Sequence, residues 1–447
     1  MPASRGGFLI RFDEEQRATF LREIAGVEAG FSDALSRDDW ALKQWEVCGL
    51  LLEPNVITHW ALARKGKKVA TGKVRVEFTE VTPTLLPLEA IEFRVGPQIR
   101  RNIVSARSGM GGRVPPATWE GLKSAVGEIS VDSRAALERL ERMRDQSREL
   151  ITRPGAEVVA QQRDAVGLAL DVFDQTGQLR KRTLLGWVAP AGAGLTSFLN
   201  GLEGVRTVED QLIARDAAVF PGGEGTRHTV VGAVFAVGGR KLEVFNVNRN
   251  AVEASLGVDL LYLHETFDAW TLVQYKSMER TDGGGDQSAV YRPDASFDAE
   301  LARMQAFRAI RPDSWTIADG SSAYRLCGDG FFFKLCSRVQ LEVLSDGLLP
   351  GMYLPRQFVE VMLVDPAAQG PRGGRLITFD NTQRHINNTL FAELVRDGWV
   401  GTRGVSSTQI ASIVSDGLSS GRAVVIARSR PEAVAADPAQ TLTALGI

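Results

Sequence analysis

The chain has 447 residues, of which 44% are hydrophobic and 24% charged. This composition is typical of globular proteins and excludes a disordered, collagen-like or coiled-coil protein. At about 150 residues per domain, the length predicts roughly three domains. Fifty-two basic and 54 acidic residues give a formal net charge of −2. The chain as a whole is therefore not a polycation, and any nucleic-acid contact must come from a local basic patch.

Cysteine usage and hydropathy point to a cytoplasmic protein. Cys48, Cys327 and Cys336 are the three cysteines, so one is necessarily unpaired and no disulfide framework is implied, which suits a reducing cytosol. The apolar run after the N-terminus is too short for a signal peptide. No window approaches 18 uninterrupted apolar residues, so we expect no membrane span.

Residues 1–115 predict a β-rich N-terminal domain. A strand at 8–12 leads into a helix at 14–25, and further strands are expected at 45–52, 57–64, 73–81 and 90–95, separated by glycine and proline turns. Residues 96–117 carry four glycines and three prolines with little apolar periodicity, which predicts a loop.

Residues 116–180 predict a helical hairpin that links two domains. Leu137, Leu140 and Met143 recur at helical spacing, and Pro154-Gly155 separates this helix from a second one at 156–173. This segment offers no residues with an obvious chemical role.

Residues 181–345 and 346–447 alternate strands and helices and predict an α/β core followed by an α/β C-terminal region, which could be part of the same core. Strands are expected at 229–237, 240–247, 258–263, 270–275, 359–364, 375–379 and 423–427, and helices at 208–220, 250–256, 297–307, 388–395 and 408–418. The pair Gly238-Gly239 marks a hairpin turn between the first two strands.

One segment of the central region carries polar residues at a defined spacing. Asp259 begins one apolar strand, and Gln274 and Lys276 end the next. Side chains at i and i+2 of a strand point to the same face, so Gln274 and Lys276 project together while Tyr275 faces the other way. If the two strands are hairpin neighbours, a carboxylate, an amide oxygen and an ammonium group come together.

Such a group of side chains suits phosphodiester hydrolysis. Mg²⁺ prefers oxygen ligands, which the carboxylate, a carbonyl and the phosphate would supply. The lysine would orient or help deprotonate the attacking water and offset negative charge on the phosphate. Glu253, on the expected helix that precedes Asp259, could reach the same metal. Glu209 and Asp210, on the helix at 208–220, are alternative helix-borne acids.

The pattern Glu-x5-Asp followed by an apolar Gln-x-Lys strand resembles the PD-(D/E)xK nuclease superfamily. Its Gln-x-Lys variant occurs in Mrr-like restriction endonucleases and in nuclease domains of bacterial anti-phage systems. The resemblance implies an α/β core, a restriction-endonuclease-like mixed sheet flanked by helices, within a chain that is α+β overall. It implies that Asp259 and Gln274 bind Mg²⁺ or Mn²⁺, that Lys276 is catalytic, and that Glu253 and the carbonyl of Tyr275 complete the metal ligands.

The function implied by this resemblance is that of a metal-dependent endonuclease in restriction or anti-phage defence, with DNA favoured over RNA as its substrate. A partner protein of a defence system and a second copy of the chain are the expected protein partners. Gln274 stands where the family usually has an acid, which leaves one negative charge fewer at the metal. The alternative is therefore a catalytically degenerate nuclease fold that serves as a binding or scaffold subunit. A third hypothesis is an unrelated α+β protein in which Asp259, Gln274 and Lys276 lie apart.

A basic segment of the N-terminal domain is a candidate for nucleic-acid binding. From residue 64 to residue 113 there are 11 basic and four acidic residues, a net charge of +7 within a chain of −2. The candidate contacts are Arg64, Lys65, Lys67, Lys68, Lys73, Arg75, Arg100 and Arg101. Such segregation suits contacts with a phosphate backbone, and the alternative is a solvated hairpin followed by a loop.

Overall fold

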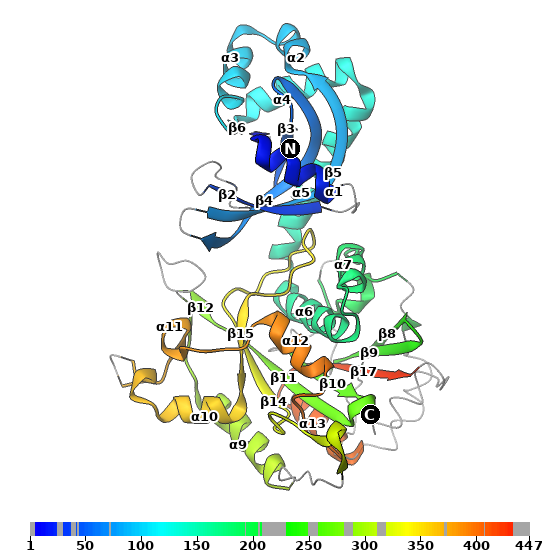
Figure 1. Cartoon of the computed structure of the whole chain (residues 1–447), viewed down its shortest axis with the longest axis vertical. Helices are drawn as coiled ribbons and strands as arrows, with labels where there is room; N and C mark the ends of the chain where they lie inside the picture. Colours follow the sequence, from blue (N-terminus) through cyan, green and yellow to red (C-terminus); the bar gives the residue numbers. More distant parts are fainter. Residues whose placement is uncertain are drawn as a thin grey trace. The chain divides into compact units, whose positions relative to one another are not determined.

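The computed structural model describes residues 5–24, 30–36, 42, 44–70, 73–192, 194–203, 206–207, 229–248, 258–280, 289–310, 319–370, 373–405 and 407–431. The chain forms two compact units, Met1–Glu149 (unit 1) and Leu150–Ile447 (unit 2). Both are mixed α/β structures in which helices flank a mixed sheet (Figure 1).

Unit 1 is built on a six-stranded sheet with the order β2-β5-β4-β3-β1-β6. The strands are β1 (Gly7–Arg11), β2 (Gly30–Ser36), β3 (Glu46–Leu51), β4 (Val56–Ala70), β5 (Lys73–Pro87) and β6 (Gly111–Val114). The helices are α1 (Glu14–Ile24), α2 (Leu88–Arg94), α3 (Pro97–Ala106), α4 (Pro116–Ile129) and α5 (Val131–Thr152). Trp119 of α4 packs edge-on against Trp60 of β4, with ring centroids 6.1 Å apart, and so fixes this helix on the sheet.

Two elements of unit 1 differ from the sequence-based expectation. Residues 90–94 of the strand predicted at 90–95 belong to α2, in which Leu88 and Ile91 are buried one helical turn apart. The predicted loop at 96–117 contains α3 and β6. Pro97 at the first turn favours the start of α3. Gly111 has φ +96° and lies so close to the carbonyl oxygen of Leu9 that a side chain there would clash, which lets β6 pair with β1.

Unit 2 is built on an eight-stranded sheet with the order β15-β14-β11-β10-β17-β9-β8-β7. Its strands are β7 (Arg206–Thr207), β8 (Thr229–Val237), β9 (Arg240–Asn248), β10 (Val258–His264), β11 (Ala269–Ser277), β14 (Phe331–Cys336), β15 (Gly351–Pro355) and β17 (Ala423–Pro431). β10 is antiparallel to β11 and parallel to β17, and β11 is parallel to β14. A small sheet holds β12 (Glu279–Arg280), β13 (Ala289–Tyr291) and β16 (Ile377–Thr378).

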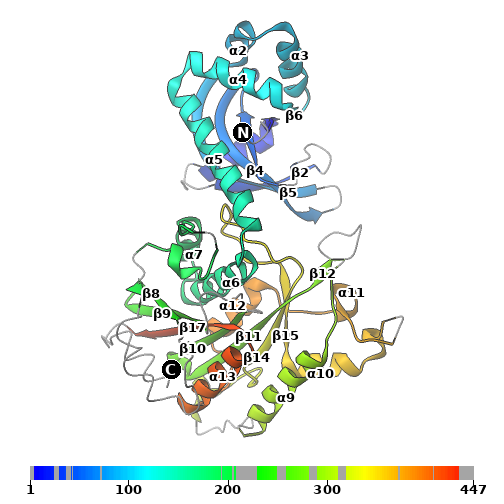
Figure 2. The same cartoon turned by 180° about the vertical axis from the view of Figure 1, so that it is seen from behind.

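Helices cover both faces of the eight-stranded sheet (Figures 1 and 2). The α-helices are α6 (Ala156–Phe173), α7 (Gln178–Leu185), α9 (Ala295–Ile310), α10 (Arg356–Val364), α11 (Phe379–Thr382), α12 (Asn388–Arg396) and α13 (Ser407–Ser419). The 3₁₀ helices are η1 (Leu199–Gly201), η2 (Glu265–Phe267), η5 (Ser321–Ala323) and η6 (Pro366–Ala368). One apolar layer joins α6 and α12 to side chains such as Tyr275 and Phe332, and a second joins α9, α10 and α13 to Leu272 and Phe333.

The structure groups the predicted segments differently from the sequence analysis, which divided the chain at 115, 180 and 345. Residues 116–149 belong to unit 1, whereas α6 belongs to unit 2. Fifteen of the 18 residues of α6 are buried, and this helix packs against β9, β10 and β17. A helix that is buried on all sides is part of a core, so α6 supports the sheet of unit 2 instead of acting as a spacer.

One further element of unit 2 differs from expectation, and others cannot be compared. The predicted strand at 359–364 is part of α10, in which Val359 and Met362 are buried and Val361 and Val364 are exposed. The predicted helices at 208–220 and 250–256 lie outside the described residues. Within the described part of the chain, no helix is both long and apolar enough to span a membrane.

Candidate active site

The predicted hairpin of β10 and β11 is confirmed, and it brings the motif residues together. Asp259 pairs directly with Gln274 across the antiparallel ladder. Lys276 lies two residues further along β11 and shares the face of Gln274. Tyr275 points to the other face, where the ammonium group of Lys334 lies 5.5 Å from the centre of its ring. The sheet therefore presents Asp259, Gln274 and Lys276 on the face covered by α9 and α13.

The crossover from β11 to its parallel neighbour β14 passes through α9, which adds a second acid to this face. Glu300 of α9 forms an ion pair with Lys276. The Lys276 ammonium group also lies 5.6 Å from the ring centre of Phe297, one helical turn earlier in α9. Lys276 is therefore held in place by a carboxylate and by an aromatic face.

Arg422, directly before β17, supplies a second cation. Its Nε and one terminal nitrogen donate to Oδ1 of Asp259, at 2.8 and 2.7 Å. The same terminal nitrogen donates to the carbonyl oxygen of Tyr275 at 3.1 Å. The other terminal nitrogen lies 3.9 Å from a carboxylate oxygen of Glu300. One guanidinium group thus joins β10, β11 and α9.

The charged groups of this centre are largely shielded from water. Asp259, Glu300 and Arg422 are each only 5% exposed. Burial raises the pKa of the Asp259 carboxyl, and Arg422 opposes that shift. Burial, followed by the positive charge of Arg422, lowers the pKa of Lys276. Burial also disfavours the charged form of Arg422, but Asp259 and Glu300 outweigh it and raise the Arg422 pKa. In this poorly hydrated site each charge is stabilised by the opposite charges beside it, whereas the two cations destabilise each other.

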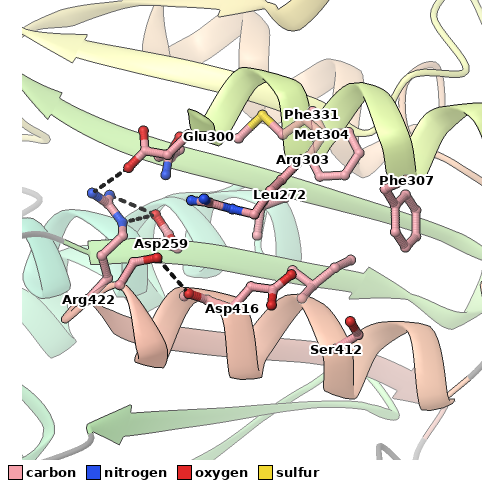
Figure 3. Close-up of a pocket in the computed structure, with 14 residues that line it drawn as sticks. Asp259, Leu272, Glu300, Arg303, Met304, Phe307, Phe331, Ser412, Asp416 and Arg422 are labelled. Carbon is pink, nitrogen blue, oxygen red and sulfur yellow. Dashed lines mark hydrogen bonds and ion pairs between the residues drawn. The ribbon is translucent and has the colours of Figure 1, made fainter. Parts of the chain in front are cut away.

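A pocket opens beside these charges, between α9, α13 and the sheet. It measures about 520 Å³ including the part open to solvent. Its apolar lining comes from Leu272, Met304, Phe307, Phe331 and Ile413. In Figure 3, α9 presents Glu300, Arg303, Met304 and Phe307 from one side and α13 presents Ser412 and Asp416 from the other, with Asp259 and Arg422 between them. The centre therefore lies at the wall of a solvent-accessible pocket.

The oxygen atoms of the centre are of the kind that Mg²⁺ prefers. They include the carboxylates of Asp259 and Glu300, the carbonyl of Tyr275 and the amide oxygen of Gln274. The Gln274 oxygen is buried and has no hydrogen-bond partner among the described residues. An unpartnered buried acceptor next to a carboxylate is chemically suited to a cation ligand set. The described residues contain no cluster of three or more His, Cys, Asp or Glu side chains suited to a metal, so amide and backbone oxygens would have to complete the ligand set.

Two of the centre's residues were not predicted from the sequence, and three predicted acids cannot be placed. Glu300 and Arg422 lie 24 and 163 positions from the residues they contact, Lys276 and Asp259. No spacing pattern in the sequence indicates either contact. The one available signal is that Arg422, like Asp259, stands at the start of an apolar strand. Glu253 lies outside the described residues, as do Glu209 and Asp210.

The basic residues of unit 1 lie on two separate groups of elements. Arg64 of β4 forms an ion pair with Glu77 at 2.6 Å and stacks over Trp45 at 4.7 Å, so it stabilises the sheet itself. Arg100 and Arg101 lie on α3, where they donate to the carbonyl of Glu92 and to Gln98. Arg75, Arg100 and Arg101 are exposed, and Lys65 is half-buried. The side chains of Lys67, Lys68 and Lys73 lie outside the described residues.

Comparisons of the chain with models of protein families, with curated proteins and with solved structures find no match.

Proposed function

We propose that this chain is a metal-dependent endonuclease that hydrolyses phosphodiester bonds, with DNA as the favoured substrate, in a bacterial restriction or anti-phage defence role. The observation that carries the proposal is the direct pairing of Asp259 with Gln274, with Lys276 on the same buried face. This is the arrangement that the resemblance to PD-(D/E)xK nucleases requires. The parallel crossover from β11 through α9 to β14 adds Glu300 to the same centre.

Each side chain has a separate task in this proposal. Asp259, the Gln274 amide oxygen, the Tyr275 carbonyl and Glu300 would hold Mg²⁺ or Mn²⁺, and Glu253 is a further candidate ligand. When bound, the metal would polarise the phosphate and acidify a water molecule. The Lys276 ammonium group would orient the attacking water and stabilise negative charge on the phosphate oxygens. Glu300 and Phe297 keep Lys276 in position for that role.

A degenerate nuclease fold that binds without cutting is the second candidate function. The contacts of Arg422 favour it, because its guanidinium group donates to Asp259 and to the carbonyl of Tyr275, two of the oxygens assigned to the metal. A fold that had lost its metal could retain such an internal cation as a structural replacement. The two candidate functions differ in whether the purified protein cleaves DNA.

Cleavage of supercoiled plasmid by the full-length protein, with Mg²⁺, with Mn²⁺ or with EDTA, tests the proposal. The wild-type protein should nick the plasmid only with metal, and Asp259→Asn should reduce the rate by about a hundredfold or more, because the metal would lose its anionic ligand on β10. Asp268→Asn is the matched control. It makes the same substitution at the other end of the β10–β11 hairpin, at a φ of +45° that asparagine tolerates. Equal activity of the wild type and Asp259→Asn would refute the proposed centre, and an inactive wild type would favour the binding subunit.

A further inference from the structure

The guanidinium group of Arg422 makes contacts that a metal at this centre would also need. It approaches Oδ1 of Asp259 at 2.7 and 2.8 Å, the carbonyl oxygen of Tyr275 at 3.1 Å and a carboxylate oxygen of Glu300 at 3.9 Å. Three oxygens from three elements therefore surround one cation. A divalent ion held by the same oxygens would lie beside a positive guanidinium group at ligand distance, where repulsion is strong in a buried site.

The formal charges of the centre are balanced without a metal. Asp259 and Glu300 contribute two negative charges, and Lys276 and Arg422 contribute two positive charges, which sum to zero. All four side chains are at most 11% exposed. A divalent cation would add two positive charges that these four side chains do not offset. Because an uncompensated buried charge is costly, entry of a metal is more favourable when one of the two resident cations leaves its carboxylate.

The pocket beside Arg422 offers an alternative position for its side chain. Arg422 follows Gly421, which has φ +74°, in the turn between α13 and β17. It lines the same pocket as Asp416 of α13 (Figure 3). Asp416 therefore offers a second carboxylate on the pocket wall. A guanidinium group turned toward the pocket would also meet an incoming phosphate, which it can bind through two parallel hydrogen bonds.

We propose that Arg422 is an internal counter-ion that competes with the divalent metal for Asp259 and the carbonyl of Tyr275, so that the metal binds only when the guanidinium group moves away. This inference rests on the proposed nuclease function. Because Arg422 lies in the turn between α13 and β17, the conformation of this turn would then set the affinity of the centre for the metal.

Binding of Mn²⁺ to the full-length protein, measured by calorimetry or by the loss of the free-ion electron paramagnetic resonance signal, tests this inference without any cleavage assay. Arg422→Gln should bind Mn²⁺ about tenfold or more tightly than the wild type, because the competent fraction of molecules rises from a minority toward unity. Arg303→Gln is the matched control. It removes the same charge from the same pocket, at a position on α9, and reports the general effect of one positive charge fewer.

The outcomes separate the inference from the function on which it rests. Equal or weaker Mn²⁺ binding by Arg422→Gln, relative to Arg303→Gln, would overturn the role of Arg422. It would not contradict the proposed metal site. If neither the wild type nor either variant binds Mn²⁺ saturably, the metal-dependent function itself is overturned. If Arg422→Gln does not fold, because Asp259 is then buried without its partner, Arg422→Lys replaces it. A single ammonium group cannot span both oxygens, so the inference predicts tighter binding than wild type for Arg422→Lys, and unchanged binding would contradict it.

Discussion

Two lysines on neighbouring strands of unit 2 illustrate how burial separates a structural charge from a candidate catalytic one. Lys334 of β14 has no exposed surface, pairs with Asp164 of α6 at 2.5 Å and lies 4.9 Å from the ring centre of Tyr353. Lys276 of β11 is 11% exposed and points to the opposite face. Of the two, only Lys276 contacts a carboxylate that lines the pocket, Glu300, so the proposed catalytic role belongs to Lys276 and a structural role to Lys334.

The three cysteines allow a test of the core at the scale of single residues. Burial raises the pKa of the Cys336 thiol to about 12. Burial, assisted by Glu46, raises the pKa of Cys48 well above its ordinary value. Because the thiolate is the reactive form, its fraction at pH 8 is then about one in ten thousand for Cys336. Cys327 is only partly buried.

We therefore expect iodoacetamide at pH 8 to modify Cys327 in the native protein and Cys48 and Cys336 only after unfolding. The thiolate fraction of Cys336 grows about tenfold per pH unit up to its pKa, so its modification should increase as the pH is raised. Mass spectrometry of peptides after timed labelling measures each site. Native labelling of Cys336 as fast as that of Cys327 would show that this part of the core is open.

At the scale of elements, α13 determines how closely the pocket wall approaches Asp259. Gly417 of α13 leaves so little room that a Cβ atom would lie 3.3 Å from Oδ2 of Asp259 and 3.1 Å from a methyl carbon of Val424. Glycine is unfavourable inside a helix, so its presence here is explained by this close approach. The helix and the strand residue must be in contact for the centre to keep its shape.

A larger residue at this position should separate the two elements. Gly417→Val is expected to lower the free energy of unfolding of unit 2 by about 1–3 kcal/mol through overpacking and to reduce plasmid cleavage. Ser419→Val introduces the same side chain at the exposed end of α13 and should leave both properties near wild type. Denaturant unfolding of the two variants beside the wild type measures the difference. A Gly417→Val protein as stable and active as Ser419→Val would contradict the close contact.

The two helical segments that were predicted as strands share one physical feature. Residues 90–95 and 359–364 are apolar-rich segments of only six residues, which are too short for their periodicity to distinguish a strand from a helix. Their burial follows a helical period, with Leu88 and Ile91 facing inward in α2 and Val359 and Met362 in α10. By contrast, the hairpin of β8 and β9 was predictable, because Gly238 and Gly239 supply the left-handed conformations that its turn requires.

At the scale of the whole molecule, the candidate centre belongs to unit 2 alone. Asp259, Gln274, Lys276, Glu300 and Arg422 all lie between Leu150 and Ile447. The sequence could predict the first three because two adjacent strands hold them. It could not predict Arg422 or Glu300, whose contacts depend on how β17 and α9 are placed in the completed sheet. The division of the chain also depends on tertiary packing, since α6 has the length of a linker helix but is buried among three strands.

The most direct test of the Asp259–Gln274–Lys276 centre is a plasmid-nicking assay with the full-length protein at increasing Mn²⁺ concentrations. The measured quantity is the rate at which supercoiled plasmid is converted to nicked circles. The wild type and a Lys241→Ala control, altered on β9, should nick the plasmid increasingly with Mn²⁺ and not at all in EDTA. Lys276→Ala should be slower by about a hundredfold or more at every concentration, because the attacking water and the phosphate charge lose their ammonium group. Nicking by Lys276→Ala at the wild-type rate, or nicking that persists in EDTA, would show that this centre does not carry out the cleavage.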